Sequence, residues 1–134
     1  LSIYTPDLEP GIYDDEEFLE VVKRLVLAKR YARVRVLISQ PSRTNRNSNR
    51  LVALGRRLNT HIEFRTVDEK FREKHDEAYL IADENALLFR ASSGKWEGIA
   101  GTHEPAIARR QLDIFDEIWD ASDFKYASHE ARVY

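Results

Sequence analysis

The chain has 134 residues, with 21 Lys and Arg, 23 Asp and Glu and a formal net charge of −2. Its length suits one domain with one core, and a hydrophobic content of 43% is typical of a folded globular protein. The absence of Cys excludes disulfides and thiolate catalysis. No stretch approaches the roughly 20 apolar residues of a membrane span, so the cytoplasm is the default location. Because the chain begins at Leu1 and has no Met, we expect it to be a piece of a larger protein.

Charge is distributed unevenly along the chain. Residues 1–20 carry seven acidic side chains and no basic one, whereas residues 21–57 carry eleven basic side chains and no acidic one. A local excess of this kind makes an anionic partner plausible where the net charge alone would argue against it.

The first half of the chain predicts alternating strands and helices. Asp14 or Asp15 is the expected cap of the first helix, and Lys29 and Arg30 give it a basic last turn that complements the helix dipole. The expected order is strand, helix, strand, helix, strand over residues 2–5, 15–31, 34–38, 48–59 and 62–66.

The second half predicts more strands and a final helix. The charged residues 67–74 indicate a loop, and apolar runs at 78–82 and 86–90 indicate a β-hairpin. A short strand near 98–100 and a helix capped by Thr102 follow, before a polar tail at 123–134. The order β-α-β-α-β-β-β-α predicts an α/β fold over residues 1–122, with a mixed β-sheet flanked by helices.

The four histidines do not predict a metal site. His61 opens a strand, His103 precedes the last helix and His129 lies in the tail, so no pair has the spacing of metal ligands. We therefore expect no metal and no cofactor.

His75 begins the segment His-Asp-Glu-Ala-Tyr-Leu-Ile-Ala-Asp, which resembles the H-x-K-x4-D motif of the phospholipase D superfamily. The order of the elements is similar too, as is the Phe-x3-Trp ending at Phe115 and Trp119, so the resemblance covers about residues 2–122. It implies one half of the phospholipase D fold, an α/β/α sandwich. In that family the His attacks a phosphodiester, the Lys stabilises the phosphate oxygens, and two halves form one active site. A homodimer or a second domain of the parent protein is the partner that the resemblance implies.

The motif is degenerate in this chain. Glu77 occupies the Lys position, which reverses the charge offered to a phosphate. Ala82 occupies the Asp position, and Asp83 follows one residue late, on the opposite face of a strand. His75 is the only catalytic candidate retained, so we expect no catalysis by this chain, because the groups that stabilise the transition state are gone.

Basic residues supply the second candidate site, for an anion near the start of the second helix. The candidates are Arg43, Arg46, Arg50 and Arg90. Alternatively, Arg50 and the following Arg56 and Arg57 are only the solvated face of that helix, paired with the acidic residues 14–20. Nucleic acid is not an expected partner, because no aromatic residues are interleaved with these arginines.

The sequence thus favours a non-catalytic phospholipase D-like domain that acts as an interaction or ligand-binding module. One alternative is a phosphodiesterase that uses His75 from two subunits, with Arg90 replacing the lost Lys. Another is an accessory domain of an enzyme whose catalytic domain lies outside this chain.

Overall fold

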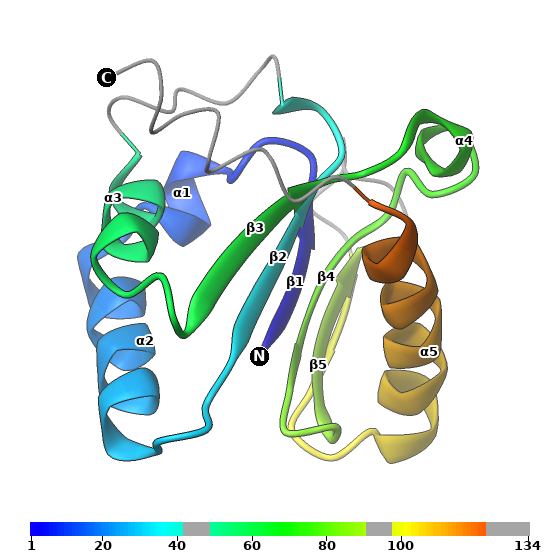
Figure 1. Ribbon diagram of the computed structural model, residues 1–134. Helices are drawn as coiled ribbons and strands as arrows, with labels where there is room; N and C mark the ends of the chain where they lie inside the picture. Colours follow the sequence, from blue (N-terminus) through cyan, green and yellow to red (C-terminus); the bar gives the residue numbers. More distant parts are fainter. Residues whose placement is uncertain (42–48, 91–97, 123–134) are drawn as a thin grey trace.

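The protein is an α/β fold with one six-stranded mixed sheet and helices on both of its faces (Figure 1). The computed structural model describes residues 1–41, 49–90 and 98–122. The predicted α/β class and the mixed sheet are confirmed.

Six strands and five helices make up the described part of the chain. The strands are β1 (Ser2–Thr5), β2 (Val34–Ile38), β3 (Ile62–Thr66), β4 (Ala78–Ala82), β5 (Ala86–Arg90) and β6 (Ile99–Gly101). The helices are α1 (Pro10–Tyr13), α2 (Glu16–Ala28), α3 (Arg50–Arg57), α4 (Glu69–Arg72) and α5 (Pro105–Ala121).

The strands lie in the order β3-β2-β1-β4-β5-β6. β1, β2 and β3 are parallel because α2 and α3 serve as crossover connections, whereas β4, β5 and β6 are antiparallel to their neighbours. After β3 the chain passes through α4 and returns on the other side of β1 to form β4. The strand order therefore reverses beside β1, which is where open α/β sheets bind ligands.

One face of the sheet is covered by α1, α2 and α3 (Figure 1). Its core is mostly aliphatic, built from inward residues of β1–β3 and the apolar stripes of α2 and α3. α3 packs closely on β3, because a Cβ on Gly55 would lie 2.3 Å from Cε2 of Phe64. The buried residues include Ile3, Val22, Val26, Val36, Leu51 and Phe64.

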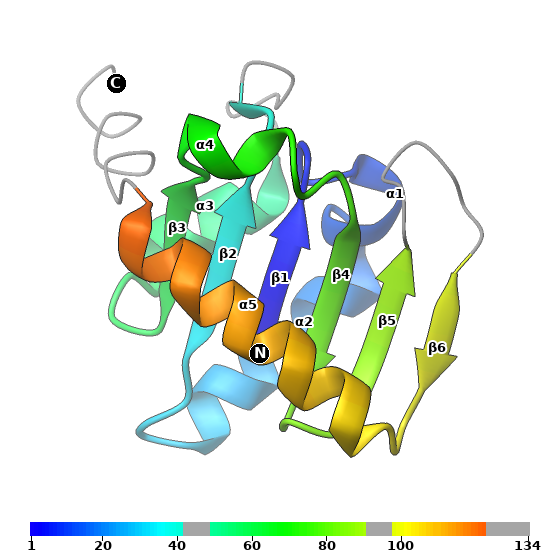
Figure 2. The ribbon, with the colours of Figure 1, turned by 90° about the vertical axis from the view of Figure 1, so that its right-hand side faces the viewer.

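α5 crosses the other face diagonally (Figure 2). This core is rich in aromatic rings, with Tyr4 stacked on Tyr79 at 5.2 Å and Phe115 stacked on Trp119 at 5.9 Å between ring centroids. The guanidinium of Arg65 lies 4.2 Å from the Trp119 ring and donates a 2.8 Å hydrogen bond to the Trp119 carbonyl. An arginine from β3 thus satisfies a carbonyl at the C-terminal end of α5.

Several element ends differ from their predictions. Asp15 caps α2 as expected, accepting a bond from the Phe18 N–H, but the backbone is extended at Lys29, so Lys29 and Arg30 lie outside the helix. α5 begins at Pro105 with Glu104 as its cap residue and without a side-chain cap, so the expectation for Thr102 was wrong. The Glu104 N–H instead donates to the carbonyl of Asn85 in the hairpin turn, a long-range contact that no local pattern reveals.

Two short helices were absent from the predictions. The charged residues 67–74 contain α4, a single turn in which the Asp68 carboxylate accepts from the Lys70 N–H. α1 is also a single turn, and both are too short to show helical periodicity. The predicted tail, residues 123–134, lies outside the described residues. In the part of the chain that the structure describes, none of the helices is long and apolar enough to cross a membrane.

Candidate functional site

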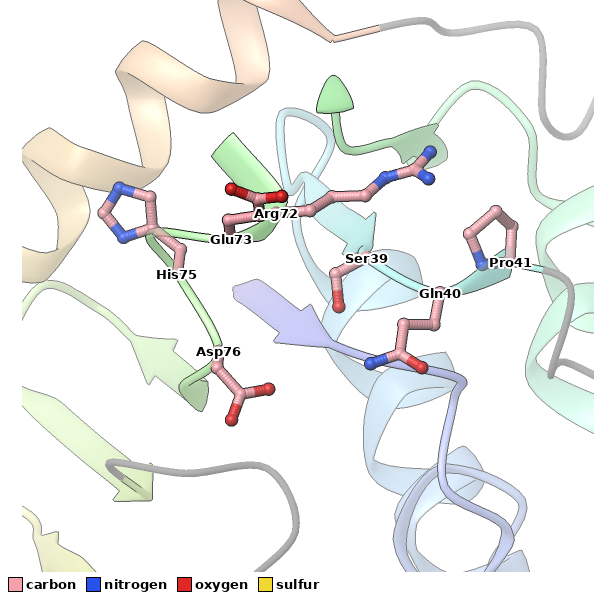
Figure 3. Close-up of a pocket in the computed structure, with 7 residues that line it drawn as sticks. All are labelled: Ser39, Gln40, Pro41, Arg72, Glu73, His75 and Asp76. Atoms are coloured by element: carbon pink, nitrogen blue, oxygen red, sulfur yellow. The ribbon is translucent and has the colours of Figure 1, made fainter. Parts of the chain in front are cut away.

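A hollow of about 380 Å³ opens at the edge of the sheet where β2 ends and β4 begins (Figure 3). This position is the topological switch point, the place beside β1 where the strand order reverses. The volume is within the range of small-molecule sites. Six of its seven lining residues have a polar or charged side chain, although apolar atoms contribute more of the lining surface than polar atoms do: Ser39, Gln40, Pro41, Arg72, Glu73, His75 and Asp76.

The segment that follows β2 forms one wall. The N–H of Ser39 donates to the Thr5 carbonyl at 3.0 Å, and the N–H of Gln40 donates to the Pro6 carbonyl at 2.7 Å. These bonds continue the pairing of β1 and β2 beyond the strand ends. The backbone of Ser39 and Gln40 is therefore held in place, and their side chains lie on the side of the hollow that faces Asp76 (Figure 3).

α4 forms a second wall and supplies the cation. Nε of Arg72 donates to the Val67 carbonyl at 3.0 Å, while the Val67 N–H donates to the carbonyl of Ile38 at the end of β2. The guanidinium is thus tied to the sheet through one nitrogen, and its two terminal nitrogens remain for other partners. In Figure 3 it points away from His75.

His75 is fixed by both its backbone and its ring. Its N–H donates to the Phe71 carbonyl at 3.0 Å, and its own carbonyl accepts from the Tyr4 hydroxyl at 2.9 Å. Burial raises the pKa of Tyr4, with Glu77 adding to the effect, so that hydroxyl stays a donor over the physiological range.

The ring of His75 forms a pair with Glu77. Nδ1 lies 2.7 Å from Oε1 of Glu77, and the two side chains are 23% and 15% exposed. A carboxylate can only accept in this contact, so the proton lies on Nδ1 and Nε2 is left as an acceptor when the ring is neutral. Glu77, which stands at the Lys position of the motif, therefore orients the histidine. Among the described residues nothing bonds to Nε2.

Arg90 does not line this hollow. It ends β5 opposite Ala78 and forms a buried ion pair with Glu9, in which the two side chains are 8% and 12% exposed. Glu9 is the cap residue of α1, so the pair lies on the face of the sheet that α1–α3 cover. A buried guanidinium needs such a partner, and the ion pair accounts for this arginine structurally.

Arg50 lies elsewhere as well. It is exposed at the first residue of α3, and its N–H donates to Oδ1 of Asp14 at 2.6 Å. Its side chain lines a groove of about 290 Å³ between α2 and α3, which has Glu16 and Glu20 on one wall and Arg50 and Arg57 on the other. This is the juxtaposition that the alternative of a solvated helix face implied. Arg43 and Arg46 lie outside the described residues.

The remaining predicted positions carry no site. His61 is half-buried with Nδ1 3.0 Å from the Ala32 carbonyl, His103 is exposed before α5, and His129 lies outside the described residues. Ala82 is the last residue of β4, and Asp83 lies in the hairpin turn with a φ of 53°. Within the described ranges, no group of three or more His, Asp or Glu side chains could hold a metal ion.

Sequence reasoning missed five polar residues that line the hollow beside His75: Ser39, Gln40, Arg72, Glu73 and Asp76. Two signals were present. Ser39 and Gln40 directly follow a strongly apolar strand, so they are expected at the carboxyl edge of the sheet, where ligands bind. Asp68 is a favourable helix cap, which indicates a helical turn that contains Arg72.

The chain matches, over residues 1–127, the model of a family described as a domain of unknown function (DUF7931), and it belongs to that family. No curated protein and no solved structure matches it significantly.

Proposed function

We propose that this member of the DUF7931 family is a ligand-binding module, of phospholipase D-like build, that binds a small polar molecule without turning it over. The observation that carries the proposal is the polar hollow at the switch point beside β1. It joins a guanidinium, a hydroxyl, a carboxamide and an imidazole in one space. The side-chain bond of Arg72 holds its guanidinium at the end of β3, and the backbone bond of Ser39 holds the segment after β2.

The lining defines the chemistry of the ligand. Arg72 is the one cation on the wall among the described residues, whereas Glu73 and Asp76 carry negative charge. A ligand that fits presents a carboxylate or phosphate to Arg72, where two terminal nitrogens can bind it side by side. It presents hydroxyl or amino groups toward Asp76. A hollow of about 380 Å³ suits a molecule of this kind.

The absence of turnover follows from the position of the charges. Stabilising a phosphoryl transition state requires cations around the reacting phosphorus. Glu77 occupies the position closest to His75, and the guanidinium of Arg72 points away from that ring.

One observation favours the alternative, a phosphodiesterase that uses His75. A carboxylate on Nδ1 with a free acceptor at Nε2 is how proteins orient a basic or nucleophilic imidazole. In that case a second copy of the chain supplies the missing cations.

One titration separates the two functions. The chain is titrated calorimetrically with inorganic phosphate and with bis(para-nitrophenyl) phosphate, and release of nitrophenolate is followed in parallel. We expect binding without release, and loss of binding in Arg72→Gln. Arg110→Gln, at an exposed position of α5, is the matched control and should bind as the unmodified chain does. Release of nitrophenolate that His75→Ala abolishes would replace the proposal by the phosphodiesterase. If neither probe binds, the proposal is wrong.

A further inference from the structure

At the C-terminal end of α2 and in the residues that follow it, cations lie beside the two most exposed large hydrophobic side chains of the described residues. Leu27 is 72% exposed and Tyr31 is 79% exposed, the highest values among the large hydrophobic residues described. They are interleaved in sequence with four cations, and we call this set the basic end surface: Arg24, Leu27, Lys29, Arg30, Tyr31 and Arg33.

The cations of this surface are not neutralised within the fold. In the described ranges no carboxylate pairs with Arg24, Lys29 or Arg30. By contrast, Arg35 pairs with Asp116 at 2.8 Å, and Arg65 pairs with Glu63 at 2.8 Å. Exposed apolar side chains surrounded by cations of one sign are typical of a surface that lies on a membrane.

Its location separates it from the ligand hollow. α2 runs antiparallel to β1–β3, so its C-terminal end lies at the opposite edge of the molecule from α4 (Figure 1). A partner bound to the basic end surface would leave the hollow open.

We propose that the basic end surface docks on the anionic face of a lipid bilayer. Leu27 and Tyr31 enter the headgroup region, where a leucine gains apolar contact and a tyrosine keeps its hydroxyl in water. The cations around them face the anionic lipids, each contributing attraction that falls as salt rises. A nucleic acid would use the same cations but would gain little from burying Leu27, because base recognition uses stacking and hydrogen bonds.

Vesicle binding tests the proposal. Partition of the chain onto phosphatidylcholine vesicles is compared with partition onto vesicles that also contain phosphatidylserine, at low and high salt. We expect binding only to the anionic vesicles and its loss at high salt. Arg30→Gln should lower the partition roughly fivefold, which corresponds to one lost charge at a membrane surface. The double variant Leu27→Ser/Tyr31→Ser should lower it by about tenfold or more.

Matched controls remove the same chemistry elsewhere. Leu88→Ser removes a leucine that is 40% exposed on β5, and Arg110→Gln removes an exposed cation on α5; both should partition normally. Circular dichroism confirms that each variant is folded. Equal partition onto neutral vesicles, or no binding at low salt, would overturn the proposal. So would anionic binding that persists in Leu27→Ser/Tyr31→Ser and is displaced by polyphosphate, because that result indicates a polyanion as the partner.

Discussion

The two faces of the sheet solve the same packing problem with different chemistry. Under α1–α3 the core is mostly aliphatic, α3 approaches β3 closely at Gly55, and the one buried cation named there, Arg90, is paired with Glu9. Under α5 the core is richer in aromatic rings, several of them stacked, and arginines from β2 and β3 lie over rings of α5, with Arg35 4.8 Å from the Phe115 ring centroid.

The α5 face also leaves polar atoms unsatisfied. In the described part of the chain, the hydroxyl of Tyr79 and Oε1 of Gln111 are buried without a hydrogen-bond partner. Burying such a group costs about 1–3 kcal/mol, so the α5 face is packed less optimally than the face under α1–α3. The comparison teaches that a helix crossing diagonally over large rings tolerates unpaired polar groups, whereas closely packed aliphatic layers do not.

Removing the buried charge pair should have the largest effect. Glu9→Ala removes the carboxylate that pairs with the buried Arg90, and breaking a buried pair in this way typically costs about 3–5 kcal/mol of unfolding free energy. Denaturant unfolding measures it. Arg109→Ala is the control, because Arg109 and Glu84 form a pair at 3.6 Å with side chains 63% and 67% exposed; it should cost about 0–1 kcal/mol. Equal losses would mean that the Glu9 pair is not sealed from solvent.

Gly55→Ala tests the close packing of the α1–α3 face. The added methyl would meet the Phe64 ring at 2.3 Å, so the ring or the helix must shift, at a cost of about 1–3 kcal/mol. Alanine favours a helix over glycine by up to about 1 kcal/mol, so any net loss is a steric effect. The cost of Gly55→Ala should be smaller in a chain that also carries Phe64→Leu than in the unmodified chain. Stabilisation by Gly55→Ala would show that the layers are looser than the structure indicates.

Two stacked tyrosines on the α5 face offer a sharper comparison. Tyr4→Phe removes the hydrogen bond to the His75 carbonyl and should cost about 0.5–1.5 kcal/mol. Tyr79→Phe removes an unpartnered hydroxyl and should be neutral or stabilising. The rings and their burial are otherwise alike, so thermal unfolding of the two variants reports the hydrogen bond directly. A comparable loss in Tyr79→Phe would indicate a water partner for that hydroxyl.

Alkaline pH should destabilise the fold through three buried tyrosines. Burial raises the pKa of Tyr4, Tyr13 and Tyr79 above the ordinary value of 10.0. The unfolded chain therefore loses these protons first, so the stabilisation is complete below about pH 10 and is lost as the pH rises through the folded-state pKa values. Tyrosinate absorbance of the chain, minus that of each Tyr→Phe variant, should rise together with loss of the circular-dichroism signal. A tyrosinate signal from these residues in a folded chain would contradict their burial.

Local patterns in the sequence were sufficient for most of the elements. Alternation at 62–66 and apolar runs at 34–38, 78–82 and 86–90 predicted β2–β5 with the observed bounds, and Asp15 was a correct alternative for the cap of α2. These signals work because side-chain periodicity and capping act over a few residues. The ends of α2 and α5 were not predicted correctly, because contacts outside the helix decide them. The presence of α4 was not predicted, because a single turn is too short to show helical periodicity.

The candidate site could be predicted only at His75 from the motif. Its companions Ser39 and Arg72 are more than thirty residues apart and meet because β2 and α4 end at the same edge of the sheet. The partner of Arg90 is 81 residues away, and the register of β4 with β5 determines which face that arginine occupies. The order and type of the elements are thus a property of short stretches of sequence. The lining of the hollow and the buried ion pair arise from tertiary packing, because only the assembled sheet brings such distant groups together and, at the ion pair, excludes water from them.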